Sequence, residues 1–370
     1  MRVLLVAVAA LAMIAPGAGC SGDRVAAPDQ PPPEPPAAAE TARNGPLVFL
    51  RPVGEGSARR YELLAVDAAG TLAGRFANRL FPGEDVAVSP DGQTVAFTRP
   101  AGTGPGAWRL GTPHDVYLAP AHGGEPRSLD RTGIDERAPR FSADGRWIAF
   151  AHSIGIETAR IGVTSIDDPG ARDAIARNGE EYGGFWAPDG HRFVFSHGSF
   201  LSGRYDLYVA DADTGEVTRI PDSDQYEGAI WAPTGDLVAT TFEERKGPDE
   251  TSIWTLAPDG SNRRLVATAS GTLQHGLAVA PNGKSMALGL TFGRGNYRVV
   301  PFPLGEHPVD VRADKGVPGW SPLWSPDGTT IAFLRGRGVW LMDADGTNPR
   351  RVPGSRGAEG LVAWLAEPAG

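Results

Sequence analysis

A short turn motif recurs six times along the chain, and no other feature of the sequence constrains the fold as strongly. Each copy places apolar residues before a turn that ends in glycine and an apolar triplet after it. The six turn glycines are separated by 53, 45, 45, 48 and 45 residues. They are Gly92, Gly145, Gly190, Gly235, Gly283 and Gly328. A period of about 45 residues is typical of β-propellers, in which each blade is a four-stranded sheet.

The last copy shows how one repeat is built. In "LWSPDGTTIAFLRGRGVWLMDADG", residues 323–346, Pro326 presets φ and Gly328 tolerates a positive φ, so the chain turns sharply between two apolar strands. A third strand follows, and the Asp343–Gly346 turn leads to a fourth near Arg350–Val352. Such a small sheet cannot bury both of its faces alone. Neighbouring blades must cover it.

Two incomplete pieces at the ends of the repeats decide the number of blades. Residues 46–70 have the pattern of the second and third strands of a blade, and residues 360–368 have the pattern of a first strand. Pairing these segments closes the ring and removes the edges that it would otherwise expose. We therefore predict an all-β fold over residues 46–370, a seven-bladed propeller of four-stranded antiparallel blades. A six-bladed ring is the alternative if either terminal piece lies outside the sheet.

The N-terminal residues have the pattern of a secretory leader. The apolar run over residues 3–14 and the small residues after it predict a signal peptide over residues 1–19. Cys20 is the one cysteine of the sequence and follows at the position of lipid attachment, so we expect it to anchor the chain. A chance cysteine in a signal sequence is the alternative. The proline-rich residues 20–45 predict a linker, and we expect no separate domain before the first strand.

Charge and motifs argue against several classes of function. The formal net charge of -9 is opposite to the basic footprint that nucleic-acid binding needs. There is no G-x-S-x-G nucleophile elbow, and the glycine-rich residues 102–111 lack the Lys-Ser/Thr ending of a phosphate loop. We therefore predict no catalytic residue and no cofactor.

Aspartates recur in the turn motif and resemble a series of metal ligands. They are Asp91, Asp144, Asp189 and Asp327. Asparagine and aspartate side chains commonly cap their own turns, and the same slot holds Asn282 and Thr234 in two other copies. We interpret these aspartates as turn caps.

The repeat pattern, "WSPDGTTIAF" followed by "VWLMDADG", resembles the WD40-like repeat of the TolB propeller family. That repeat also occurs in the propeller domains of prolyl oligopeptidases. The resemblance covers nearly all of the chain from Pro46 onward and implies a non-enzymatic protein that binds a partner in the cell envelope. Ser21, rather than Asp, follows Cys20 and resembles the outer-membrane sorting pattern, so we expect a lipid-anchored protein at the outer membrane, facing the periplasm.

The same resemblance also implies an alternative. Some TolB-like seven-bladed propellers are metal-dependent oligogalacturonate lyases, whose metal is held by histidines and a glutamine. The residues that would match this set are His152, His197, Gln274 and His275. Imidazole and amide groups are plausible ligands for a transition metal.

Positions that vary between repeats indicate where a ligand binds. The strands of a blade alternate in direction, so the residues before the first strand and after the second lie at the same rim. The position eight residues before each turn glycine, and the positions next to it in the sequence, hold carboxylates, aromatics, arginine and histidine. The candidate ligand-binding residues are Glu84, Asp85, Arg137, Glu181, Tyr182, Tyr226, Glu227, His275 and Trp320. Such a mixture on a rigid scaffold is typical of a binding site, although rim loops are polar in any propeller.

The charge and shape of these side chains predict the class of partner. Clustered carboxylates favour a basic group, and flat aromatics suit stacking or a bound cation. We therefore expect a monomer whose channel mouth binds a protein, a peptide or a cell-wall component. It would touch the membrane through its lipid anchor alone and bind no nucleic acid.

Overall fold

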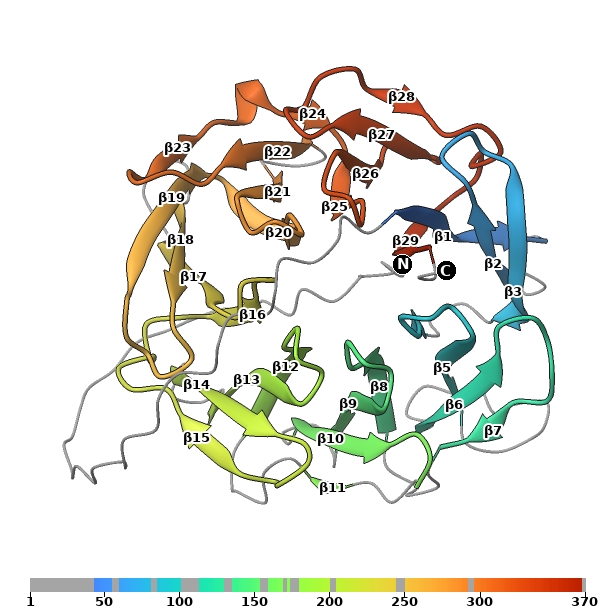
Figure 1. Ribbon diagram of the computed structural model, residues 1–370, viewed down its shortest axis with the longest axis horizontal. Coiled ribbons are helices and arrows are strands. Elements are labelled where there is room, and N and C mark those ends of the chain that lie inside the picture. The colour runs from blue at the N-terminus through green and yellow to red at the C-terminus, as the bar shows by residue number, and fades with distance from the viewer. Residues whose placement is uncertain are drawn as a thin grey trace.

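The structure, a computed structural model, describes residues 43–54, 60–80, 85–100, 113–129, 135–153, 159–168, 172–173, 180–199, 204–243, 250–291 and 296–367. Within these residues the chain forms seven small sheets around one axis (Figure 1). This confirms the all-β, seven-bladed propeller, and the six-bladed alternative is wrong. The predicted signal peptide and Cys20 lie outside the described residues, as does almost all of the predicted linker.

Blades 1 to 3 each contain four consecutive antiparallel strands, and the first strand of each lies beside the channel (Figure 1). Blade 1 consists of β4 (Val86–Val88), β5 (Thr94–Pro100), β6 (His114–Pro120) and β7 (Arg127–Ser128). Blade 2 consists of β8 (Asp135–Phe141), β9 (Trp147–Ser153), β10 (Ala159–Ser165) and β11 (Arg172–Asp173). Blade 3 consists of β12 (Glu180–Trp186), β13 (Arg192–Ser199), β14 (Arg204–Asp211) and β15 (Val217–Arg219).

Blades 5 and 6 repeat this plan with very short outer strands. Blade 5 consists of β20 (Thr272–Val279), β21 (Ser285–Thr291), β22 (Tyr297–Pro303) and β24 (Val317–Pro318), which follows the 3-10 turn η2 (Ala313–Lys315). Blade 6 consists of β25 (Trp320–Trp324), β26 (Thr330–Leu334), β27 (Val339–Asp343) and β28 (Arg350–Arg351).

Blade 4 departs from the predicted four strands because it has a fifth. Its own strands are β16 (Gly228–Trp231), β17 (Leu237–Glu243), β18 (Glu250–Leu256) and β19 (Arg264–Ser270). The connection from β22 to β24 leaves blade 5 and adds β23 (Val309–Val311) in parallel to β19. Since β19 is long, β23 covers an outer edge that would otherwise expose unpaired backbone groups.

Blade 7 joins the two ends of the described chain, as predicted. Its strands are, from the channel outward, β29 (Gly360–Ala366), β1 (Asn44–Val53), β2 (Arg60–Val66) and β3 (Leu72–Leu80). The register of β1 and β29 pairs Asn44 with Ala366 and Leu50 with Gly360. The indole N–H of Trp364 also donates to the Gly45 carbonyl at 3.1 Å. The last strand of the sequence therefore closes the ring next to the first (Figure 1).

The apolar triplet of each repeat packs against two neighbouring blades at once. In β5, Val95 and Phe97 belong to the cluster shared with blade 7, whereas Ala96 belongs to the cluster shared with blade 2. Successive side chains of a strand point to opposite faces, and the second strand of a blade is covered on both. In β9, Phe150 and Ala149 divide between two clusters in the same way. Among the described residues, one such cluster fills each interface between blades.

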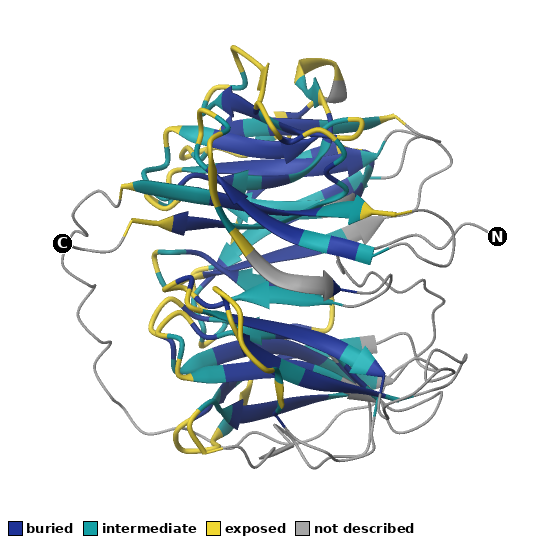
Figure 2. Cartoon of the chain, turned by 90° about the vertical axis from the view of Figure 1, so that its right-hand side faces the viewer, coloured by how far each residue is buried: buried dark blue, intermediate teal, exposed yellow. Residues whose placement is uncertain are grey.

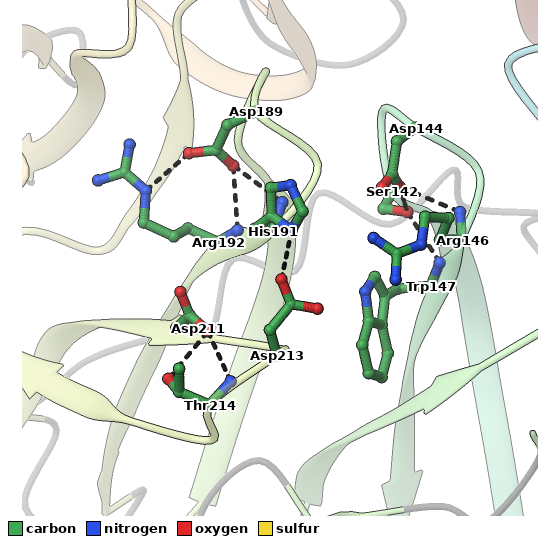
Figure 3. A network of polar contacts seen from close by, with 10 residues as sticks. All are labelled: Ser142, Asp144, Arg146, Trp147, Asp189, His191, Arg192, Asp211, Asp213 and Thr214. Carbon is green, nitrogen blue, oxygen red and sulfur yellow. Dashed lines mark hydrogen bonds and ion pairs between the residues drawn. The ribbon is translucent and has the colours of Figure 1, made fainter. Parts of the chain in front are cut away.

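The repeated turns lie at one end of the ring, where exposed segments border the buried strands (Figure 2). All six turn glycines have φ between 67° and 88°, a range that favours glycine. Asp144 accepts hydrogen bonds from the Ser142 hydroxyl at 2.5 Å and from the Arg146 N–H at 3.0 Å, and Asp189 accepts one from the His191 N–H (Figure 3). Partial burial opposes ionisation of Asp144, but these hydrogen bonds lower its pKa on balance. The aspartates are turn caps, as predicted.

Candidate functional site

The predicted binding residues lie where the inner strands of the blades begin, at the end of the channel opposite the repeated turns. We call this end the mouth. Asp85 and Glu227 precede β4 and β16, Arg137 and Glu181 lie in β8 and β12, and Trp320 begins β25. Glu84 lies outside the described residues. The backbone of Tyr182 lies in β12 and that of His275 in β20, but the description does not extend to their side chains.

Glu181 lies inside the protein, contrary to the expectation of an open rim. It is 1% exposed, and its Oε2 atom accepts a hydrogen bond of 2.8 Å from the backbone N–H of Ile161 in blade 2. Glu136 in β8 does the same one blade earlier, because its Oε2 accepts the N–H of Val116 at 2.7 Å. We call these two carboxylates the blade latches. Each joins the first strand of one blade to the third strand of the preceding blade.

The need for a latch follows from the short outer strands. A buried backbone N–H must find a partner, and the fourth strand is too short to reach the start of the third. In blades 3 and 6 a serine hydroxyl accepts the corresponding bond, because the Leu207 N–H donates to Ser223 Oγ at 2.9 Å and the Val339 N–H donates to Ser355 Oγ at 3.1 Å. The sequence analysis did not identify this role. Its signal is a recurring polar residue, either at the second position of a first strand, as for the latches, or between the fourth strand of one blade and the first strand of the next, as for the serines.

The two described aromatics of the predicted site differ in exposure. Tyr226 is 2% exposed and packs edge-on against Trp254, with ring centroids 6.5 Å apart, so it belongs to the interface of blades 3 and 4 rather than to an open rim. Trp320 is half-buried and packs edge-on against Tyr297, with centroids 5.9 Å apart. Trp320 therefore keeps part of its ring surface accessible at the mouth.

Asp85 and Arg137 are partly exposed and also structural. Asp85 Oδ2 accepts the backbone N–H of Ala138 at 3.0 Å, at a bulge in β8 where Ala138 has a φ of 50°. Arg137 pairs with Asp135, with 3.1 Å between Nε and Oδ1. Arg140 lies deeper: desolvation lowers the pKa of its guanidinium, and the charge of Asp85 opposes that shift. Asp85 thus stabilises blade 2 while part of its surface stays at the mouth.

Glu227 is the most unusual carboxylate of the mouth. Its side chain is half-buried, and burial raises its pKa from 4.5 to about 7. No hydrogen bond or ion pair joins its carboxylate to another described residue. Glu227 is therefore able to exchange a proton near neutral pH, and it presents an acceptor that a cationic partner would stabilise in the charged form.

Replacing Glu227 with glutamine is expected to stabilise the chain at pH 8 and not at pH 4. Below the unfolded-state pKa of 4.5 the carboxyl is protonated in both states, and stability falls as pH rises toward the folded-state value of about 7. Because the side chain is partly exposed, we expect a gain of only about 1 kcal/mol at pH 8. Urea unfolding at the two pH values measures it. The control Glu216→Gln makes the same substitution at an exposed turn on the opposite end of the ring. An equal effect of both variants would contradict the shifted pKa of Glu227.

The residues of the alternative metal set come from three blades. His152 lies in β9, His197 in β13, and Gln274 with His275 in β20. Of these four, His197 alone has a described side chain, and its Nδ1 lies 3.8 Å from Oε1 of Glu181. The described residues contain no group of three histidine, cysteine, aspartate or glutamate side chains placed to hold a metal ion. The set stays a prediction.

The comparisons with known proteins agree with the repeat pattern. No family profile matches the chain. The chain is 30% identical over 111 residues to the Tol-Pal system protein TolB of Gluconobacter oxydans. Over these residues the chain is similar to TolB. The match covers 27% of this chain and 23% of the length of that protein, so most of the relative is not matched.

Two solved structures are similar to the chain at low sequence identity. TolB from Acinetobacter baumannii is 16% identical, with a TM-score of 0.47 over 84% of this chain and 80% of its own. Oligogalacturonate lyase from Vibrio parahaemolyticus is 12% identical, with a TM-score of 0.50 over 85% of this chain and 90% of its own. The second likeness supports the propeller fold and nothing more specific.

In the part of the chain that is described, no helix has the length and apolar character needed to cross a membrane.

Proposed function

We propose that this chain is a non-enzymatic protein of the cell envelope whose mouth binds a protein, a peptide or a cell-wall ligand. The sequence relation to a Tol-Pal system protein supports a binding role in the envelope. The observation that carries the assignment to the mouth is Glu227, a half-buried carboxylate without a described partner, at the same end of the channel as the partly open ring of Trp320.

The chemistry of the mouth favours a cationic partner. A cation would form the ion pair that Glu227 lacks, and an aromatic face such as that of Trp320 attracts a cation or stacks on a sugar. Asp85 adds negative charge, although one of its oxygens already accepts a backbone N–H. A peptide segment with lysine or arginine, or an amino sugar of the cell wall, has these properties.

The N-terminal residues complete the proposal. Residues 1–19 direct export, Cys20 carries the lipid, and residues 20–45 hold the propeller away from the membrane. In this arrangement the protein is a monomer anchored in the outer membrane and facing the periplasm.

The double variant Trp320→Ala/Glu227→Lys is expected to lower recovery of crosslinked envelope partners by about tenfold or more. The loss of recovery should be largest at low salt, because salt screens the repulsion between the introduced lysine and a cationic partner. Quantitative capture from crosslinked membranes, with folding checked by circular dichroism, measures it. The matched control Trp147→Ala/Glu216→Lys makes the same chemical changes at the opposite end of the ring.

Two outcomes would contradict this assignment. Equal recovery with the mouth variant and the control would place the binding surface elsewhere on the propeller. About one equivalent of transition metal in the purified chain, lost on substitution of His197 or His275, would instead favour the polysaccharide lyase similar to oligogalacturonate lyases.

A further inference from the structure

A basic hollow lies on blade 6, outward from the mouth. Its volume is about 470 Å³, and two of its walls come from the loop between β26 and β27 and from the loop that leads into β29. The residues that line it are Arg335, Arg337, Trp340, Arg351, Arg356 and Gly357. We call it the arginine pocket. Four guanidinium groups in one hollow are unexpected in a chain whose net charge is -9.

Positive charge in the pocket exceeds the negative charge that touches it. Among the described residues, one carboxylate pairs with a pocket arginine: Glu359, whose Oε1 lies 2.9 Å from Nη2 of Arg337. Arg335 lies over the ring of Trp340 at 4.7 Å, and Arg356 has no ion pair within the described chain. The four arginines therefore retain about three uncompensated charges after Glu359 is counted.

Arg351 is held in place by the fold of the blade. Trp340 and Arg351 are paired across β27 and β28, so their side chains lie on the same face of the sheet. Arg351 also donates to the Arg337 carbonyl at 3.1 Å, and the Gly357 N–H donates to the same carbonyl at 2.8 Å. At Gly338 a Cβ atom would lie 2.8 Å from Nε of Arg351. The missing side chain leaves the space that the Arg351 guanidinium occupies.

We propose that the arginine pocket binds a phosphate group of higher charge, a phosphomonoester or a diphosphate, carried on a larger molecule. Guanidinium groups bind phosphate oxygens through paired hydrogen bonds, and a group with two or three negative charges matches the excess in the pocket. A single carboxylate would leave most of that excess unmatched. The volume lies in the range of small-molecule sites, which leaves room beyond the phosphate itself.

Two sources can supply this ligand. One is a soluble phosphorylated molecule, and the other is the phosphorylated headgroup of a lipid. The pocket opens at the same end of the ring as the mouth, so a single large partner can contact both. The anion site does not depend on the proposed function, because its residues are separate from those of the mouth.

Pyrophosphate is the probe that tests the pocket. Calorimetric titration at fixed ionic strength would use the full chain carrying Cys20→Ser, so that no acyl group takes part. We expect pyrophosphate to bind, and the double variant Arg335→Gln/Arg356→Gln to weaken binding by about tenfold or more. The control Arg350→Gln removes one positive charge from the residue next to Arg351, and this arginine pairs with Asp343 outside the pocket at 3.3 Å. That control should change binding by less than about twofold.

The outcomes separate the sources and decide the proposal. Co-sedimentation with vesicles that contain phosphatidic acid, lost in the double variant and absent with phosphatidylcholine alone, would identify a lipid headgroup. Binding of free pyrophosphate without vesicle binding would identify a soluble ligand. Failure of the parent chain to bind either probe would overturn the proposal, as would an equal loss in Arg350→Gln. Binding of malonate as tight as that of pyrophosphate would overturn the assignment to phosphate.

Discussion

Removal of residues 360–370 is expected to abolish cooperative thermal unfolding of the chain and to cause aggregation. The deletion removes β29, which pairs with β1 and supplies Trp364 and Leu365 to the clusters on the two sides of blade 7. Each buried apolar side chain of this size contributes about 1.5–3 kcal/mol, so these two alone contribute about 3–6 kcal/mol, which is a large part of the ~5–15 kcal/mol stability of a typical domain. The open edge of β1 would then be available to pair with other chains.

Calorimetry and size-exclusion chromatography of the truncated protein measure this effect. Removal of residues 368–370 alone is the matched control, because it leaves β29 intact and should preserve the melting temperature. If the longer deletion melted like the full chain, ring closure through β29 would not stabilise the propeller.

The number of blades and their closure could be predicted because packing imposes them directly on the sequence. The second strand of every blade is buried on both faces, so it needs an uninterrupted apolar triplet such as Val95 to Phe97. The turn before it needs a residue that tolerates positive φ, which Gly92 and its equivalents supply. Both requirements are local: the triplet recurs in every blade, and the turn recurs in the six blades whose first two strands are consecutive in the sequence. The fifth strand of blade 4 was missed because β23 pairs with β19 across about 40 residues of sequence, far beyond any local pattern.

The site was harder to predict because side-chain direction at the mouth depends on which backbone groups lack partners. Glu181 and Glu227 occupy neighbouring places in successive repeats, yet one is 1% exposed and bonded to Ile161 while the other has no described partner. In blade 3 the corresponding N–H, that of Leu207, already donates to Ser223 Oγ, so no carboxylate from the next blade is needed there. The arginine pocket could not be predicted from the sequence for a similar reason. Arg335, Arg351 and Arg356 belong to separate strands and loops, and only the folded blade shows that they face one hollow.

The blade latches offer the clearest test of how the ring is held together from blade to blade. Glu136 is fully buried, and the N–H of Val116 that it accepts belongs to another blade. Replacement by leucine removes the cost of burying a carboxylate but leaves that N–H without an acceptor. Replacement by glutamine keeps a side chain of the same length, so its amide oxygen can still accept the Val116 N–H. The comparison therefore separates loss of the hydrogen bond from loss of the charge.

We expect Glu136→Leu to lower the free energy of unfolding by about 2–4 kcal/mol and Glu136→Gln by about 1 kcal/mol or less. Glu181→Leu should have a similar effect at the next interface, and because the latches join different pairs of blades, the double leucine variant should lose roughly the sum. Ser223→Ala, at the serine that replaces a latch in blade 3, should cost less, about 1 kcal/mol, since a neutral hydroxyl makes the weaker hydrogen bond. Urea unfolding of these variants measures the differences. A leucine variant as stable as the parent chain would show that the buried carboxylates do not hold the blades together.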